Sequence, residues 1–387
     1  MSKNLAPYQI FFPFGVFSAL IAVGVWNVQT LGWFAAPALF VHSRLIAGGF
    51  LWSFIVGFLM TAIPRMTGTE PAKRLETLAA MVLMLVLFGS SWLVESQPFY
   101  GTVAAINIFL VFYAGQRLLR SVKRVPVFFS HVGLGLVASL LGAFFYFEGD
   151  SFKGLHLFHV GSVLLLVLGI GARFYSFLSG LPSDFESAPR WQHNIFHGLG
   201  VLTGTFLFLA GSGSHLAYLG LTAVSVIYLV FVWRIQRPAN RVSPLRWAVQ
   251  AVAWMIPLSF ALCWFRPSLI VTWLHLIFLG SFAMITFSVS TRVILAHGSY
   301  PLEMELSSKA SETDRAVDTS VSTPLKWLVL FLLAALVARV GYGLASGVWR
   351  TVFLHLSTAC WFLAVGGWMK ACFAKIFVSG PLKKPGC

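Results

Sequence analysis

Histidine is the residue type in this chain whose number and spacing could do chemistry. Ten histidines occur among 387 residues of which only 10% are charged. Three of them, His156, His275 and His355, stand in the same Leu-His-Leu triplet. A neutral imidazole in dry surroundings suits haem iron or copper, and two imidazoles facing each other across a gap can hold one haem. The histidines therefore predict a metal or haem site, if apolar elements surround them.

The histidines belong to an internal repeat. His156 and His275 are each followed by a Gly-Ser pair and, after sixteen intervening residues, by Arg173 and Arg292; the two segments align without gaps at an offset of 119. His42 lies 114 residues before His156. Such a spacing is typical of a repeated structural unit. It predicts three four-helix units, each with a histidine early in its second helix, with candidate boundaries 1–125, 126–245 and 246–387.

The elements that position these residues must be membrane helices. The chain is 58% hydrophobic with a mean hydropathy of +0.83, whereas soluble domains carry about 25% charged residues. This composition excludes a soluble multidomain enzyme, a disordered chain and a secreted disulfide scaffold. Stretches of about 20 apolar residues can each cross a bilayer. They predict one all-α polytopic membrane domain of about twelve helices, near 10–28, 42–63, 77–95, 100–119, 126–147, 155–178, 194–211, 215–233, 247–265, 270–296, 326–345 and 350–373.

The positive charges orient this domain. With alternating helices, 22 of the 27 lysines and arginines fall on one side, which the positive-inside rule makes cytoplasmic. Both termini and a flexible linker at about 298–325 are then cytoplasmic. The net charge of +15 is explained by topology and by attraction to anionic lipid, not by nucleic acid. The exceptions on the opposite side are Arg44, Lys153, Arg266, Arg339 and Arg350.

This topology sorts the histidines by depth. His42 and His275 open the second and tenth helices on the periplasmic half and could hold a haem between them. His156 and His159 are three residues apart on one helix face and, with His355, could form a second metal or gas site. The alternative for each histidine is a hydrogen bond between helices. His131, His193, His197 and His297 fall on the cytoplasmic half.

Three segments resemble a known family. The second helix ends in Gly57–Gly68 (GFLMTAIPRMTG), the sixth in Gly171–Phe177 (GARFYSF) and the tenth in Thr291–Gly298 (TRVILAHG). Together they resemble the NnrS family of bacterial inner-membrane proteins over nearly the whole chain. One departure is at the start of the second helix, where the family's His-x-His-Glu run is replaced by His42-Ser43-Arg44-Leu45.

The resemblance implies a multi-pass protein of the bacterial inner membrane with haem b and copper as cofactors. It also implies a role in the response to nitric oxide. We therefore expect that gas as the ligand, and a respiratory-chain protein is a candidate partner. The family pattern carries over to His42, His275, Arg292 and His297. Whether the protein is an oxidoreductase stays open, as do two alternatives. One is a transporter of a metal or small anion along a histidine-lined path, and the other is a cofactor-free partner of a respiratory complex.

A second resemblance is architectural. Periplasmic-side histidines on helices 2, 6 and 10 of a twelve-helix chain are similar to the catalytic subunits of haem-copper oxidases and nitric oxide reductases. The helices of this chain lack internal acidic residues, and the seventh helix lacks paired histidines midway. These absences argue against a proton-pumping oxidase.

Overall fold

All regular secondary structure among the described residues is helical. The computed structural model describes residues 5–33, 37–181, 188–240, 244–298 and 322–377. No strand occurs within these ranges. The predicted all-α class is therefore confirmed, while the predicted linker at about 298–325 lies mostly outside the described residues.

The helices follow one another with short connections, and several are continued by a π-helical segment. The first five α-helices and one π-helix are α1 (Pro7–Thr30), α2 (Ala38–Arg44), η1 (Leu45–Leu51), α3 (Trp52–Thr67), α4 (Arg74–Ser90) and α5 (Gln97–Leu119). Next come α6 (Phe129–Phe147), α7 (Ser151–Gly154), η2 (Leu155–Gly161), α8 (Ser162–Ser179), α9 (Arg190–Gly211), α10 (Leu216–Ile227) and η4 (Tyr228–Val232). The last are α11 (Pro244–Ala253), α12 (Met255–Phe265), η5 (Pro267–Leu269), α13 (Ile270–His275), η6 (Leu276–Ala283), α14 (Met284–His297), α15 (Ser322–Leu344) and α16 (Val348–Ile376).

The predicted apolar stretches all coincide with helical segments. Within the described residues, ten helices are long and apolar enough to cross a membrane. The stretch predicted at 77–95 forms α4, which ends at Ser90 after 17 residues, and the stretch predicted at 215–233 forms the shorter apolar helix Leu216–Val232. The chain is thus a multi-pass membrane protein by the length and apolar character of its helices.

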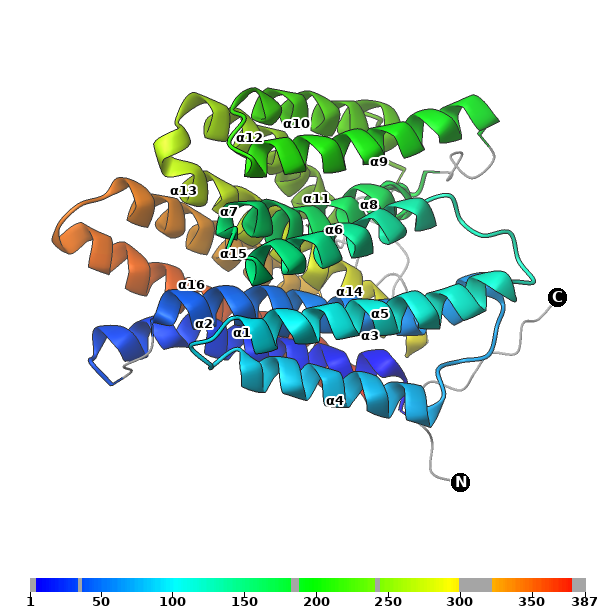
Figure 1. Ribbon diagram of the computed structural model, residues 1–387, viewed down its shortest axis with the longest axis horizontal. Coiled ribbons are helices and arrows are strands. Elements are labelled where there is room, and N and C mark those ends of the chain that lie inside the picture. Colours follow the sequence, from blue (N-terminus) through cyan, green and yellow to red (C-terminus); the bar gives the residue numbers. More distant parts are fainter. Residues whose placement is uncertain (1–4, 34–36, 182–187, 241–243, 299–321, 378–387) are drawn as a thin grey trace, which may run out of the picture.

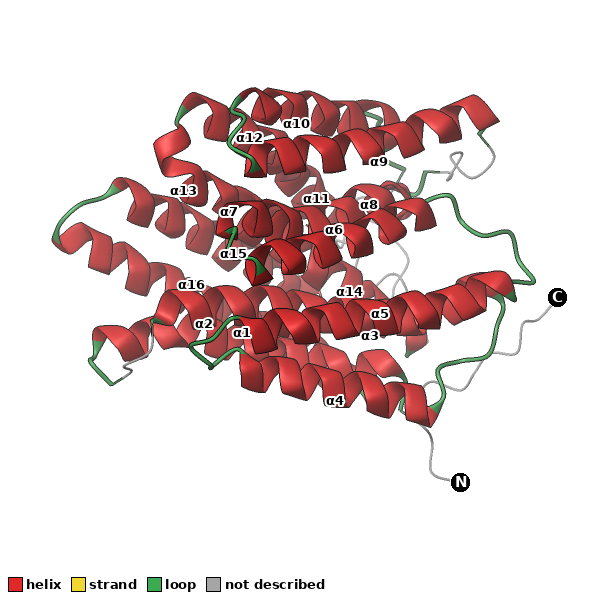
Figure 2. Cartoon of the chain, viewed as in Figure 1, coloured by secondary structure: helices red, strands yellow, loops and turns green. Residues whose placement is uncertain are grey.

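The helices run along the long axis of one bundle (Figures 1 and 2). At one end of the bundle, on the left in Figure 1, lie α2, α7 and α13, which begin the spans that carry His42, His156 and His275. The first and last helices meet at the opposite end, where the Gln9 side-chain amide donates to the carbonyl of Ile376 at 2.7 Å. The described chain therefore starts and finishes at the same end, as an even number of crossings requires.

Two spans form the buried centre of the bundle. They are Ala38–Thr67 and Ser151–Ser179, whose apolar windows are 78% and 89% buried. The spans that carry His42, His156 and His159 are therefore enclosed by protein on most sides. Of these three histidines, His156 and His159 are buried and His42 is half-buried.

Candidate functional site

His42 occupies the last turn of α2, immediately before η1. Its Nδ1 lies 2.8 Å from the carbonyl oxygen of Ala22 on α1, and its ring packs edge-on against Trp26 at 5.7 Å between centroids. A carbonyl can only accept, so Nδ1 donates; in a neutral imidazole the lone pair is then on Nε2. Nε2 has no hydrogen-bond partner among the described residues. This is the arrangement in which a second hydrogen bond orients a metal-binding imidazole.

His275 has the same arrangement on the tenth span. It is the last residue of α13, immediately before η6, and its Nδ1 donates to the carbonyl of Val271 at 2.6 Å. Its Nε2 likewise has no partner in the described part of the chain. His42 and His275 are therefore both half-buried, and each has an Nε2 without a hydrogen-bond partner among the described residues.

The structure brings these two histidines into one region. His275 lies close enough to His42 for a charge on one ring to act on the other, and Arg339 of α15 lies within the same range of both. His159 of η2 is similarly close to His42, with the backbone of Ser43 beside its ring. His275, Arg339 and His159, from three other spans, thus all lie within electrostatic range of His42.

His159 contributes a buried nitrogen without a partner. Its Nδ1 hydrogen-bonds the Tyr146 hydroxyl at 3.1 Å, while its Nε2 is fully buried and makes no hydrogen bond. An orphaned buried polar atom costs about 1–3 kcal/mol, and native structures have few of them. Of the predicted second-site residues, His159 is therefore the one with a buried nitrogen that makes no hydrogen bond of normal geometry, and the backbone of Ser43 lies beside its ring.

The other two predicted second-site residues use different partners. His156 is fully buried with both nitrogens occupied: Nδ1 donates to Phe152 at 2.9 Å and Nε2 accepts from the Tyr218 hydroxyl at 2.7 Å. His355 is exposed on α16, with Nδ1 2.8 Å from the amide oxygen of Asn27. Within the described ranges, no three His, Cys, Asp or Glu side chains are placed to hold a metal ion together. The set His156, His159 and His355 is thus not assembled, and copper binding stays a prediction.

The remaining predicted residues lie toward the other end of the bundle. His297 ends α14, where its Nδ1 donates to Val293 at 2.8 Å and its ring packs against Tyr8 at 4.9 Å. Arg292 lies over the ring of Phe177 on α8 at 4.4 Å, which links the sixth and tenth spans. Arg173 on α8 is exposed.

A second polar cluster, not singled out in the sequence, joins α6 and α9. His131 is fully buried, stacks on Phe196 at 3.9 Å, and hydrogen-bonds Tyr228 through Nε2. The Ser130 hydroxyl bridges Nδ1 of His131 at 3.2 Å and Nδ1 of His197 at 2.8 Å. These bonds occupy both nitrogens of His131, so they indicate helix–helix contact.

Sequence reasoning also missed the groups that complete the histidine site. Tyr146 and Tyr218 fix two of the histidines, and Arg339 lies beside two others. A signal was available for Arg339, because it stands on the side of the membrane with few positive charges. Tyrosines carry no comparable signal in a chain with 16% aromatic residues.

Comparison with known proteins agrees with the motifs. A search of curated proteins found no match to this chain. A model of the family described as NnrS protein matches residues 5–379, which is nearly the whole chain. The resemblance seen in the three helix-end segments thus extends over all the described spans, and the chain belongs to the NnrS family.

Proposed function

We propose that this NnrS protein binds one haem b between His42 and His275 and uses it in the response to nitric oxide. Family membership supports a membrane protein related to the nitric oxide response. The observation that carries the haem proposal is the shared state of the two histidines. Both donate from Nδ1 to a backbone carbonyl, keep Nε2 free, and lie close together on opposite spans.

The residues present fit such a group. Two neutral imidazoles from separate helices are the ligand set of a bis-histidine haem. Their Nδ1 bonds make the lone pairs on Nε2 available before any ligand arrives, and the buried second span keeps water away. When bound, haem would supply one-electron redox chemistry. The unpartnered Nε2 of His159 could hold or orient a small polar ligand nearby.

The test is a reduced-minus-oxidised absorption spectrum of the full-length protein, purified after expression with haem supply. We expect b-type haem bands in the wild type. His275→Ala should remove them, because it deletes one of the two proposed ligands.

His297→Ala is the matched control on the same span. His297 also donates from Nδ1 to a carbonyl four residues earlier, but it lies near Arg65 and Tyr8 at the other end of the bundle. This variant should keep the haem bands. The reverse outcome would move the site to that end, and a wild type without haem bands would favour the transporter or the cofactor-free partner.

A further inference from the structure

Among the residues that the structure describes, Arg339 and Arg350 are positive charges without a negative partner. They lie on the side of the membrane that carries only five of the 27 cationic residues. The ion pairs seen in the described chain join Arg117 to Glu76 and Lys153 to Asp150. Neither Arg339 nor Arg350 has an acidic neighbour within the part of the chain that the structure covers.

The two guanidinium groups converge on one aromatic ring. The Cζ atoms of Arg339 and Arg350 lie 4.6 Å and 4.7 Å from the centre of Tyr342. Nη1 of Arg339 is buried and makes no hydrogen bond. A buried charged donor without an acceptor is more costly than a neutral one, and two like charges beside one ring repel each other. Both facts point to an oxyanion that binds between them.

Helix packing places Arg339 level with His275. A side chain on Gly343 would collide with Thr272, since its Cβ would lie 2.2 Å from the Thr272 hydroxyl. Arg339 is one turn below Gly343 on α15, and His275 is about one turn past Thr272 on α13. Because the Leu336 side chain also approaches Gly280 at 3.2 Å from its would-be Cβ, the two helices stay in this antiparallel register.

We propose that Arg339, assisted by Arg350, binds the propionate carboxylates of the haem held by His42 and His275. The proposal rests on the proposed haem function. Haem carries two carboxylates on one edge, and the planar guanidinium group matches a carboxylate with two parallel hydrogen bonds. The carboxylates would supply the acceptor that Arg339 lacks and would separate the two positive charges. A lipid phosphate offers similar oxyanion chemistry, so the experiment must distinguish the two sources.

The experiment compares haem with haem dimethyl ester, in which both carboxylates are masked. Each is titrated into full-length protein purified without haem. We expect the wild type to bind haem roughly tenfold or more tightly than the ester, the effect of a charge-assisted hydrogen bond of about 1.5–3 kcal/mol. In Arg339→Gln the preference for haem over the ester should fall to nearly none. Arg339→Lys should show a preference between those of the wild type and Arg339→Gln.

Arg266→Gln is the matched control, because Arg266 lies on the same sparsely charged side at the end of α12. It should keep the full preference. Gel filtration and thermal unfolding show whether each variant folds. If Arg339→Gln does not fold, the preference for haem over the ester is compared between Arg350→Gln and Arg266→Gln instead.

The outcomes separate the two proposals. If the wild type binds haem but Arg339→Gln keeps the wild-type preference over the ester, the arginine proposal is wrong and the haem proposal stands. Loss of copurifying phospholipid from Arg339→Gln, with that preference intact, would assign the arginine to a lipid headgroup. If the wild type binds neither compound, the haem proposal is wrong, and the arginine proposal, which depends on it, is wrong as well.

Discussion

At the scale of single residues, four histidines are oriented by a backbone carbonyl that accepts from Nδ1. His156, His275 and His297 each donate from Nδ1 to the carbonyl four residues earlier in their own span. His42 instead reaches Ala22 on the neighbouring helix α1. This bond fixes the ring of His42 relative to another helix, so its Nε2 direction depends on the packing of α1 against the second span.

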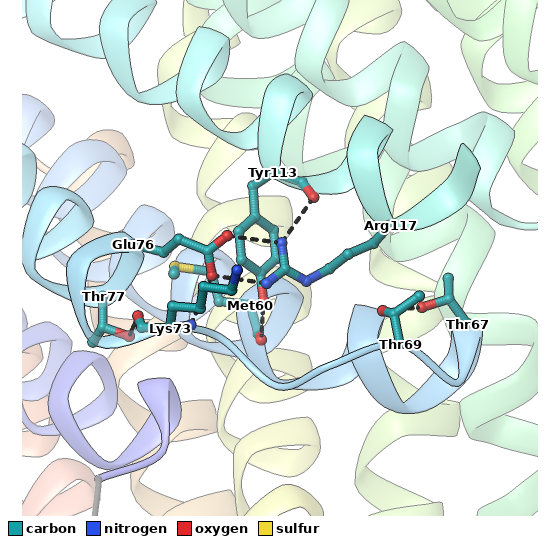
Figure 3. Close-up of polar contacts among 8 residues, drawn as sticks. All are labelled: Met60, Thr67, Thr69, Lys73, Glu76, Thr77, Tyr113 and Arg117. Atoms are coloured by element: carbon teal, nitrogen blue, oxygen red, sulfur yellow. Dashed lines mark hydrogen bonds and ion pairs between the residues drawn. The ribbon is translucent and has the colours of Figure 1, made fainter. Parts of the chain in front are cut away.

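A charged residue outside the membrane gives a testable pH dependence. Glu76, at the start of α4, accepts from Arg117 of α5 at 2.7 Å and from the backbone N–H of Lys73 at 2.7 Å (Figure 3). Arg117 also lies over the ring of Tyr113, at 3.7 Å. Partial burial alone would raise the pKa of Glu76, but the hydrogen bonds and charge of Arg117, with the Lys73 N–H, lower it below its ordinary value.

Because the folded pKa is depressed, the stabilisation is complete above the ordinary carboxyl pKa of about 4.3 and is lost as pH falls through the folded value. Glu76→Gln should therefore lower the free energy of unfolding by about 1 kcal/mol at pH 7, with a smaller difference below pH 4. Thermal unfolding of the wild type and Glu76→Gln in detergent, from pH 7 to below pH 4, measures this difference in stability. A deficit that stays constant with pH would contradict the assignment.

The sequence could predict which histidines open the second and tenth spans, because it shows both the residue type and its position along each apolar stretch. It could not predict their acceptors. Ala22 and Val271 act through main-chain carbonyls, which any residue could supply. Nor could it predict that His156 and His159 form hydrogen bonds to different helices, through Tyr218 on α10 and Tyr146 on α6.

At the scale of helices, π-helical turns recur beside the histidines. One begins three residues after His42, one follows His275 directly, and one contains His156 and His159, each in the second span of a predicted unit. A π-helical turn widens the backbone and is common at functional sites. The recurrence is consistent with the predicted repeat, although these wider turns could not be predicted from helical periodicity.

The packing of α6 against η2 depends on one glycine. A Cβ on Gly142 would lie 2.3 Å from the backbone nitrogen of Phe158, which cannot move like a side chain. Gly142→Ala should therefore destabilise the protein by about 2 kcal/mol or more, as overpacking does. It should also loosen the neighbouring His159 site. Thermal unfolding measures the first effect.

Gly133 on the same helix is the matched control. It is exposed and has open space around its would-be Cβ. Gly133→Ala should be neutral or stabilising by up to about 1 kcal/mol, because alanine favours the helix. Equal destabilisation by both substitutions would show that packing against η2 is not the cause.

At the scale of the whole molecule, the bundle joins segments that are distant in sequence. The first helix contacts the last through Gln9 and Ile376, and through the Trp361 indole, which donates to the Ala19 carbonyl at 3.2 Å. Apolar stretches predicted the helical class, which the described residues confirm. Charge asymmetry predicted that both termini are cytoplasmic, and this stays a prediction. These two features could not predict that the second and sixth spans are the buried ones, because almost every span is apolar on all faces.

The central claim is that His42 and His275, which the bundle brings together from opposite halves of the chain, ligate one haem. Electron paramagnetic resonance of the oxidised, full-length protein tests it directly. We predict a low-spin ferric signal of bis-histidine type, at one haem per chain, that is converted to high spin or lost in His42→Ala and His275→Ala alike. A high-spin wild type, or a low-spin signal that survives either substitution, would contradict the claim.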